Sequence, residues 1–219
     1  MSIVKDIQVK AITPQVANVF VRKNHYSGKV VPNSQLHFGA FYNNVLHGVM
    51  QFGPSINKKG TINLVEDTGW NEFVELNRMA FDDFLPKNSE SRCISVAIRL
   101  IKKHAPHIKW IISFADGTQC GDGTIYRASG FSLIKIKKNT SMWVNGNTGQ
   151  RMQDMQFYHT MTKKTNEWHR IPGNMLTYIK LLKDGQRINA EILPYSTIDN
   201  KGAGMYLGKK VTLAERTVA

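Results

Sequence analysis

The chain has 219 residues, of which 42% are hydrophobic and 21% charged, and its 29 basic residues against 16 acidic ones give a net charge of +13. This composition excludes a disordered chain, and no apolar run is long enough for a bilayer-spanning helix, so we expect a soluble protein with one main core. The positive electrostatic field that this net charge produces attracts polyanions. It favours nucleic acid as a partner over a basic surface that serves only solubility or an anionic cofactor.

The N-terminal residues and the cysteine content point to the same compartment. The first 15 residues, MSIVKDIQVKAITPQ, lack the basic and then apolar order of a secretory signal. The chain holds only two cysteines, Cys93 and Cys120, which is too few for a disulfide framework. We therefore expect a reducing, cytoplasmic setting without a membrane.

In the N-terminal quarter the pattern predicts a strand, a helix and a hairpin. Imperfect alternation of apolar and polar residues predicts a strand from Val4 to Ile12. Thr13 and Pro14 then form an N-cap followed by proline at the first helical position, and the helix should end near Asn24. Two apolar runs within residues 35–53 flank Asn43-Asn44, which predicts a tight hairpin.

The middle of the chain alternates strands and helices. A strand is expected at Phe73–Phe81 and a buried strand at Lys109–Ala115, with a short helix at Gly123–Ser129 closed by Gly130. Between the two strands an inward stripe predicts an amphipathic helix, formed by Ile94, Val96, Ala97, Leu100 and Ile101. After residue 138 we expect further strands, and a helix around Asn174–Lys183.

A polar loop precedes the amphipathic helix and is a candidate anion site. Asn88, Ser89, Glu90 and Ser91 supply small or capping residues there, and the positive end of a helix favours phosphate. The loop carries neither a Walker A sequence nor a GxGxxG pattern. The alternative is that Ser89 or Ser91 simply caps a structural helix.

This order of elements resembles the acyl-CoA-dependent N-acetyltransferase (GNAT) superfamily, which also supplies a match for IYRASGF (residues 125–131). The resemblance implies an α/β fold with a mixed, mostly antiparallel sheet flanked by helices. It also implies acetyl-CoA or a related acyl-CoA, bound by Asn88, Ser89 and Ser91. PKNSESR replaces the usual glycine-rich pyrophosphate loop, and Arg92 is the candidate cationic partner of the diphosphate.

Several motifs in one order resemble, more closely, the bacteriophage Mom DNA-modification proteins. These motifs are NHYS (residues 24–27), ELNRMAF (75–81), PKNSESR (86–92) and SFADGTQCGDGTIYRASGF (113–131). The resemblance implies a phage enzyme that converts adenine in double-stranded DNA to its N6-carbamoylmethyl form and so shields the DNA from host restriction. We expect residues 1–140 to form the catalytic core and residues 141–219 an extension packed on it that contacts DNA.

Four residues are the catalytic candidates: Asp116, Tyr126, Arg78 and Ser113. Asp116 follows a buried strand and is expected to accept a proton from the adenine amine or to orient it; otherwise it caps the next turn. Tyr126 is expected to serve the departing thiolate, or else it packs a helix on the sheet. Arg78, in an otherwise apolar strand, needs a partner such as Glu75, Glu90, Asp116 or a ligand phosphate. Ser113 belongs to the same motif as Asp116.

The resemblance also implies iron, for which His25 and Tyr26 are the candidate ligands. The sequence itself contains no spaced ligand set. Two other functions stay open at this stage. One is an ordinary N-acetyltransferase of a protein or small-molecule amine, and the other is a non-catalytic DNA-binding module that retains the fold.

Overall fold

The computed structural model describes residues 3–117, 121–160 and 166–200. Two compact units interleave along this chain. The first unit consists of residues 1–113, 125–134 and 178–192, and the second of residues 114–124, 135–177 and 193–219. The division of the chain at residue 140 into a core and an extension stays a prediction.

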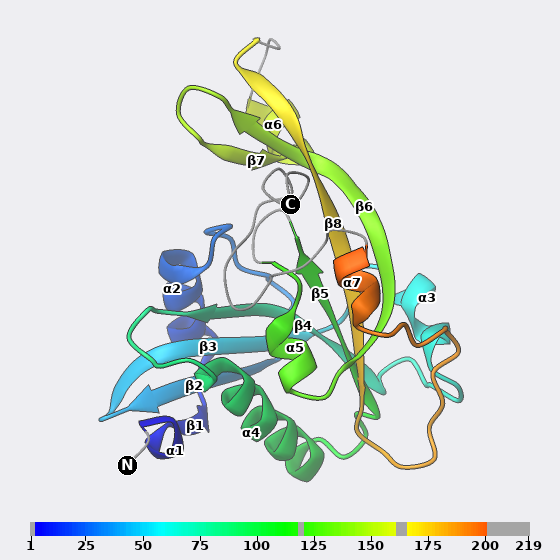
Figure 1. The fold of residues 1–219 in the computed structure, drawn as a ribbon. Coiled ribbons are helices and arrows are strands. Elements are labelled where there is room, and N and C mark those ends of the chain that lie inside the picture. Colours follow the sequence, from blue (N-terminus) through cyan, green and yellow to red (C-terminus); the bar gives the residue numbers. More distant parts are fainter. Residues whose placement is uncertain (1–2, 118–120, 161–165, 201–219) are drawn as a thin grey trace. The chain divides into compact units, whose positions relative to one another are not determined.

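Eight strands in the described residues hydrogen-bond in the order β1-β2-β3-β4-β5-β8-β6-β7 (Figure 1). Their bounds are β1 Gln8–Ala11, β2 Leu36–Tyr42, β3 Val45–Gly53, β4 Phe73–Phe81, β5 Trp110–Asp116, β6 Ser132–Asn145, β7 Arg151–Gln153 and β8 Trp168–Leu181. Strands β1 to β4 pair antiparallel, β4 pairs with β5 in parallel, and β6 pairs antiparallel with β7. The expected mixed, mostly antiparallel sheet is confirmed.

Helices flank the sheet. They are α1 Ile3–Asp6, α2 Pro14–Asn24, α3 Lys58–Thr61, the 3-10 turn η1 Ile62–Leu64, α4 Ser89–His104, α5 Thr124–Ala128, α6 Asp154–Thr160 and α7 Ser196–Asn200. In the first unit α2 packs Ala17 and Val21 against Val49 of β3 and Ala80 of β4. Helix α4 buries Ile94, Ala97 and Ile101 of the expected apolar stripe, while Val96 and Leu100 are half-buried. Within the described residues, no helix is long and apolar enough to cross a membrane.

Strands β4 and β5 pair only over a short ladder. Phe73, Val74 and Glu75 of β4 lie opposite Trp110, Ile111 and Ile112 of β5. Beyond this ladder, the register between β3 and β4 shifts by one residue. Gln51 pairs with Arg78, whereas Phe52 pairs with Leu76. Asn77 is thus an extra residue in β4, and a bulge of this kind bends its strand. The bulge lies where β4 leaves β5, so Glu75 is at the end of the parallel ladder.

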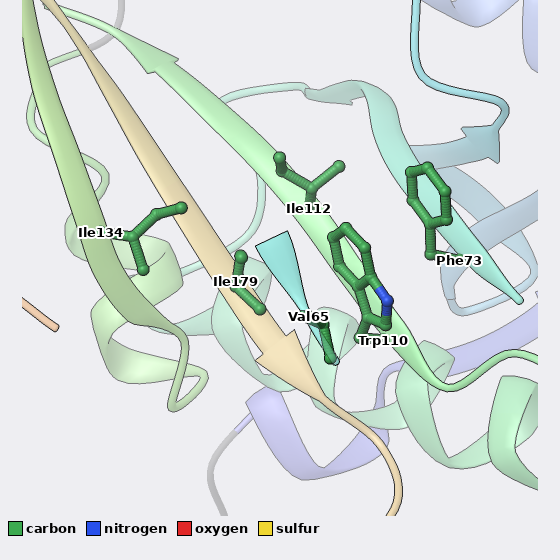
Figure 2. Packing of buried hydrophobic residues seen from close by; sticks show 6 residues of the cluster. All are labelled: Val65, Phe73, Trp110, Ile112, Ile134 and Ile179. Carbon is green, nitrogen blue, oxygen red and sulfur yellow. The ribbon is translucent and has the colours of Figure 1, made fainter. Parts of the chain in front are cut away.

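A hydrophobic cluster holds this end of the sheet together (Figure 2). The rings of Phe73 and Trp110 stack with centroids 4.4 Å apart and planes 4° apart. Ile112, Ile134, Ile179 and Val65 complete the cluster, and all six residues are buried. Trp110 also donates its Nε1–H to Thr68 Oγ1 at 3.0 Å. These contacts fix the two strands on one side of the point where they separate.

The structure confirms most of the expected elements and corrects two. The strand expected at Val4–Ile12 is wrong in its first half, where α1 occupies Ile3–Asp6 and only Gln8–Ala11 pairs as β1. The helix expected around Asn174–Lys183 is wrong, because that segment belongs to the 14-residue strand β8. Cys93 is buried and free, and burial raises its pKa to about 12. Cys120 lies outside the described residues.

Candidate active site

A row of polar side chains crosses three strands of the first unit beneath α2. His37 of β2 lies directly opposite Gln51 of β3, and Gln51 lies directly opposite Arg78 of β4. Directly opposed residues of antiparallel strands share one face of a sheet. Gln51 is fully buried, donates through Nε2 to Asn18 of α2 at 2.9 Å, and contacts His37 Nδ1 at 3.0 Å. Its Oε1 has no hydrogen-bond partner among the described residues.

Arg78 ties this row to the loop that follows α2. Its Nε donates to the backbone carbonyl of Lys29 at 2.8 Å, and its Nη1 donates to the carbonyl of Asn77 at 2.7 Å. The pKa of Arg78 is lowered by burial, while the charges of Tyr26 and Glu75 act in the opposite direction. Glu75, one of the partners expected for Arg78, interacts with it electrostatically.

His25 and Tyr26 lie in that loop, next to Arg78. Their ring centroids are 4.2 Å apart. His25 Nδ1 accepts from the backbone N–H of Ser27 at 3.2 Å and lies 2.8 Å from the Ser27 hydroxyl, so the neutral ring carries its proton on Nε2. Burial, and then the Arg78 cation, lower the pKa of His25 to about 4. His25 is therefore a neutral imidazole at physiological pH.

Glu75 was expected only as a partner of Arg78, and the structure makes it a functional candidate in its own right. The side chains of Ser55 and Asn77 and the backbone N–H of Ile56 bond to its carboxyl group. Burial raises its pKa, although these bonds and the Arg78 charge oppose the shift. A carboxylate of raised pKa at the point where two strands separate has the character of a general base. In the sequence, FVELN reads only as a strand with one outward glutamate, because the bulge and the loop at Ser55 are long-range features.

The residues expected to hold a cofactor diphosphate lie at the start of α4. Asn88 is the N-cap residue with a left-handed φ of 72°, and its side chain makes no capping bond. Ser89 is buried and donates to Pro86 O at 2.6 Å, and Ser91 donates to Asn88 O at 3.2 Å. Arg92 donates to the carbonyls of Val4 and Lys5, and so anchors α1. Ser129, the residue after α5, donates to Ser91 O at 3.3 Å, which brings the end of α5 to this end of α4.

Ser113 and Tyr126 also lie in the first unit. Ser113 follows the last β5 residue of the parallel ladder, and its buried hydroxyl has no hydrogen-bond partner within the described residues. Tyr126 is buried on α5, with its ring 5.5 Å from Phe131 and 5.3 Å from Tyr178 between centroids. These ring contacts pack α5 on the sheet, which is the alternative to a catalytic role for Tyr126. Its role at the thiolate stays a prediction.

Asp116 ends β5 in the second unit. Its side chain is 4% exposed and accepts a hydrogen bond from Asn139 Nδ2 at 3.1 Å. The next residue, Gly117, donates its backbone N–H to Asn174 O at 2.7 Å. The carboxylate is therefore held by β6 and is not a freely rotating loop side chain.

The donor set for iron is incomplete. Among the described residues, no group of three or more histidine, cysteine, aspartate or glutamate side chains is placed to hold a metal ion. His25 and Tyr26 offer two ligands, and the adjacent Arg78 cation opposes a further positive charge. The described residues do not support an iron centre here, and we assign no step to a metal. The role of His25 and Tyr26 as iron ligands stays a prediction.

Comparison with known proteins identifies related sequences. Residues 6–196 match the Mom protein family. The methylcarbamoylase Mom of Escherichia phage Mu is 36% identical over 159 residues, which are 72% of this chain and 62% of that protein. The chain thus matches less than two thirds of the length of this relative.

Solved structures with a similar chain path include two acetyltransferases. One is the Bacillus subtilis acetyltransferase in complex with CoA, with 14% identity, a TM-score of 0.45, and coverage of 81% of this chain and 98% of that one. The other is an N-acetyltransferase from Staphylococcus aureus, with 11% identity, a TM-score of 0.47, and coverage of 81% and 99%. At these values the similarity concerns the fold alone.

Proposed function

Because the chain belongs to the Mom protein family, we propose that it is a transferase that converts adenine in double-stranded DNA to an N6-carbamoylmethyl derivative and so protects phage DNA from host restriction. The observation that carries this proposal is the polar cluster of Glu75, Arg78, His25 and Tyr26. It offers a carboxylate of raised pKa, a cation and a neutral imidazole around the end of the β4–β5 ladder.

The acceptor amine sets the first requirement. Adenine N6 is paired and stacked inside a duplex, so an enzyme that modifies it must extrude the base, at a cost of a few kcal/mol. A net charge of +13 supports binding to the DNA backbone. Tyr26 is more than half exposed beside His25 and gives the cluster an aromatic face for a base.

The donor sets the second requirement. An acyl-CoA carries a diphosphate, and the start of α4 combines the positive end of a 16-residue helix with Asn88, Ser89 and Ser91. Arg92 would contribute charge at that end, although two of its nitrogens already hold α1. Tyr126 on the adjacent α5 would donate a proton to the departing thiolate.

Proton removal from the amine is the third requirement, and the chain offers two carboxylates for it. Asp116 is held by Asn139 and would orient or deprotonate the amine. Burial raises the pKa of Glu75, and a carboxylate of raised pKa is a stronger base than an ordinary one. The Ser113 hydroxyl, which lies in the first unit with Glu75, would act as a hydrogen-bond donor.

The product differs in its connectivity from the product of an acetyl transfer. A carbamoylmethyl group is joined to N6 through its methylene carbon and ends in a primary amide. A simple acetyl transfer would instead join N6 to a carbonyl carbon. Because an acetyl group carries no nitrogen, the amide nitrogen of the product must come from another donor.

Mass spectrometry of nucleosides tests the proposal. Plasmid DNA from cells that express the chain should contain a deoxyadenosine derivative with the added mass of a carbamoylmethyl group. DNA from cells that express Asp116→Asn at an equal level should contain much less of it. Unmodified DNA from well-expressed, folded protein would contradict the proposal. Acyl-CoA binding would then distinguish an ordinary N-acetyltransferase from a DNA-binding module without catalytic activity.

A further inference from the structure

In the second unit, helix α6 carries exposed apolar side chains that the proposed chemistry does not use. Met155 is 77% exposed and Tyr158 is 56% exposed. Because they are three residues apart on a helix, they share one face, and His159 extends that face. The opposite side of α6 is anchored by Phe157, which is buried with Trp143, Met152 and Trp168.

Tyr158 is held in place although it is exposed. Its hydroxyl accepts from Arg170 Nη2 at 3.3 Å, and its ring packs edge-on against Trp143 and Phe157. The same Arg170 nitrogen lies 3.0 Å from Asp154 Oδ1, which accepts from Trp143 Nε1 at 2.6 Å. The Arg170 cation also lies 4.9 Å from the centroid of the Trp143 ring. This network fixes an aromatic ring at the surface before any partner binds.

The exposed charges of the described second unit are mostly basic, although Arg170 is already paired with Asp154. The exposed basic residues of the described second unit are Lys135, Lys137, Lys138, Arg151 and Arg170. Its exposed acidic residues are Glu167 and Asp199. Arg151 lies at the start of β7, which leads directly into α6. Proteins that wedge into stacked bases combine an exposed apolar or aromatic side chain with a nearby basic residue that holds a phosphate, and Met155, Tyr158 and Arg151 offer this combination.

From these observations we infer that Met155 and Tyr158 form a wedge that inserts into the base stack of double-stranded DNA when an adenine is extruded. The inference rests on the proposed function, because a wedge has a use only if the enzyme opens the duplex. The apolar side chains replace part of the stacking that the extruded base loses, and Arg151 contacts a phosphate beside them.

Fluorescence anisotropy of a labelled duplex, titrated with the full chain at several salt concentrations, tests the wedge. Tyr158→Ala should weaken binding roughly tenfold without changing the salt dependence, because the lost contact is stacking. Met155→Ala should act in the same direction and removes no part of the buried cluster. Arg151→Gln should instead reduce the slope of log affinity against log salt by about one. Tyr158→Phe keeps the ring and should bind as the wild type does.

A matched control lies outside the second unit. Trp70 in the first unit is 52% exposed, close to the exposure of Tyr158, and Trp70→Ala should leave DNA affinity unchanged. Wild-type affinity in both Tyr158→Ala and Met155→Ala would overturn the wedge while leaving the proposed function intact. Loss of self-association in these variants, with unchanged DNA affinity, would also overturn it and would assign the face to a second copy of the chain. Failure of the wild-type chain to bind DNA would overturn both proposals.

Discussion

The guanidinium of Arg78 donates from Nε to the backbone carbonyl of Lys29 at 2.8 Å, and this bond joins β4 to the loop that carries His25 and Tyr26. The two residues are 49 positions apart in the chain. One arginine therefore both positions the loop and sets the electrostatic environment of its histidine.

Replacing Arg78 with glutamine should raise the pKa of His25. The Arg78 charge is the second cause of the low value, after burial, so the pKa of about 4 should rise but stay below its ordinary value. The variant should also lose about 2 kcal/mol of unfolding free energy, because two hydrogen bonds from a charged group disappear. NMR titration of the His25 ring measures the first effect. An unchanged pKa would contradict the placement of Arg78 beside His25.

His25 should make the folded protein less stable as the pH falls. The unfolded residue titrates near 6.5 and the folded one near 4, so between these values the unfolded chain binds a proton that the native chain does not. The contribution of His25 to the free energy of unfolding is therefore fully present above about pH 6.5. This contribution is lost as the pH falls towards about 4. Urea unfolding across this window should show a smaller loss for His25→Asn than for the wild type. Equal losses would rule out a buried neutral His25.

Glu75 should control the pH dependence of the reaction if it acts as the base. Glu75→Gln should lower the rate roughly a hundredfold or more. Ser55→Ala removes a hydrogen bond that lowers the pKa of Glu75, so the limb of the rate profile that rises with pH should move to higher pH. Ser196→Ala, an exposed serine on α7, is the control. A rate profile that does not move in Ser55→Ala would exclude Glu75 as the base.

Gly53 should be intolerant of a side chain. A Cβ at this position would lie 2.8 Å from the carbonyl of Asn33 and 2.7 Å from Oδ1 of Asn77, the bulge residue of β4. Gly53→Ala should therefore cost about 1–3 kcal/mol of unfolding free energy and reduce activity. Gly146→Ala is a suitable comparison, because its Cβ would meet only ordinary contacts beyond 3.5 Å. Equal stability of the two variants in urea would show that the bulge tolerates displacement.

Sequence patterns predicted the regular elements well where one periodicity dominates. The amphipathic stripe of α4 and the hairpin turn at Asn43-Asn44 lie where they were expected. The segment at Asn174–Lys183 was misassigned because its apolar residues fit a helix and a strand alike. Its place as a strand between β5 and β6 depends on tertiary pairing.

The misassigned strand near the N-terminus and the unexpected environment of Glu75 both depend on contacts between residues far apart in the sequence. The carbonyls of Val4 and Lys5 accept bonds from Arg92, more than 80 positions along the chain, which no local alternation reveals. The family motifs did name His25, Tyr26 and Arg78, which the structure brings together. Glu75 stands in one of these motifs but was expected only as a partner of Arg78, because its raised pKa depends on burial beside the bulge at Asn77.

The central claim is that this chain alters adenine in DNA, and the mass of the deoxyadenosines in DNA from expressing cells tests it most directly. A species heavier by a carbamoylmethyl group is expected with the wild-type chain, and little or none with Glu75→Gln or Asp116→Asn at equal expression. Deoxyadenosine of ordinary mass alone, from cells that hold folded wild-type protein, would contradict the account.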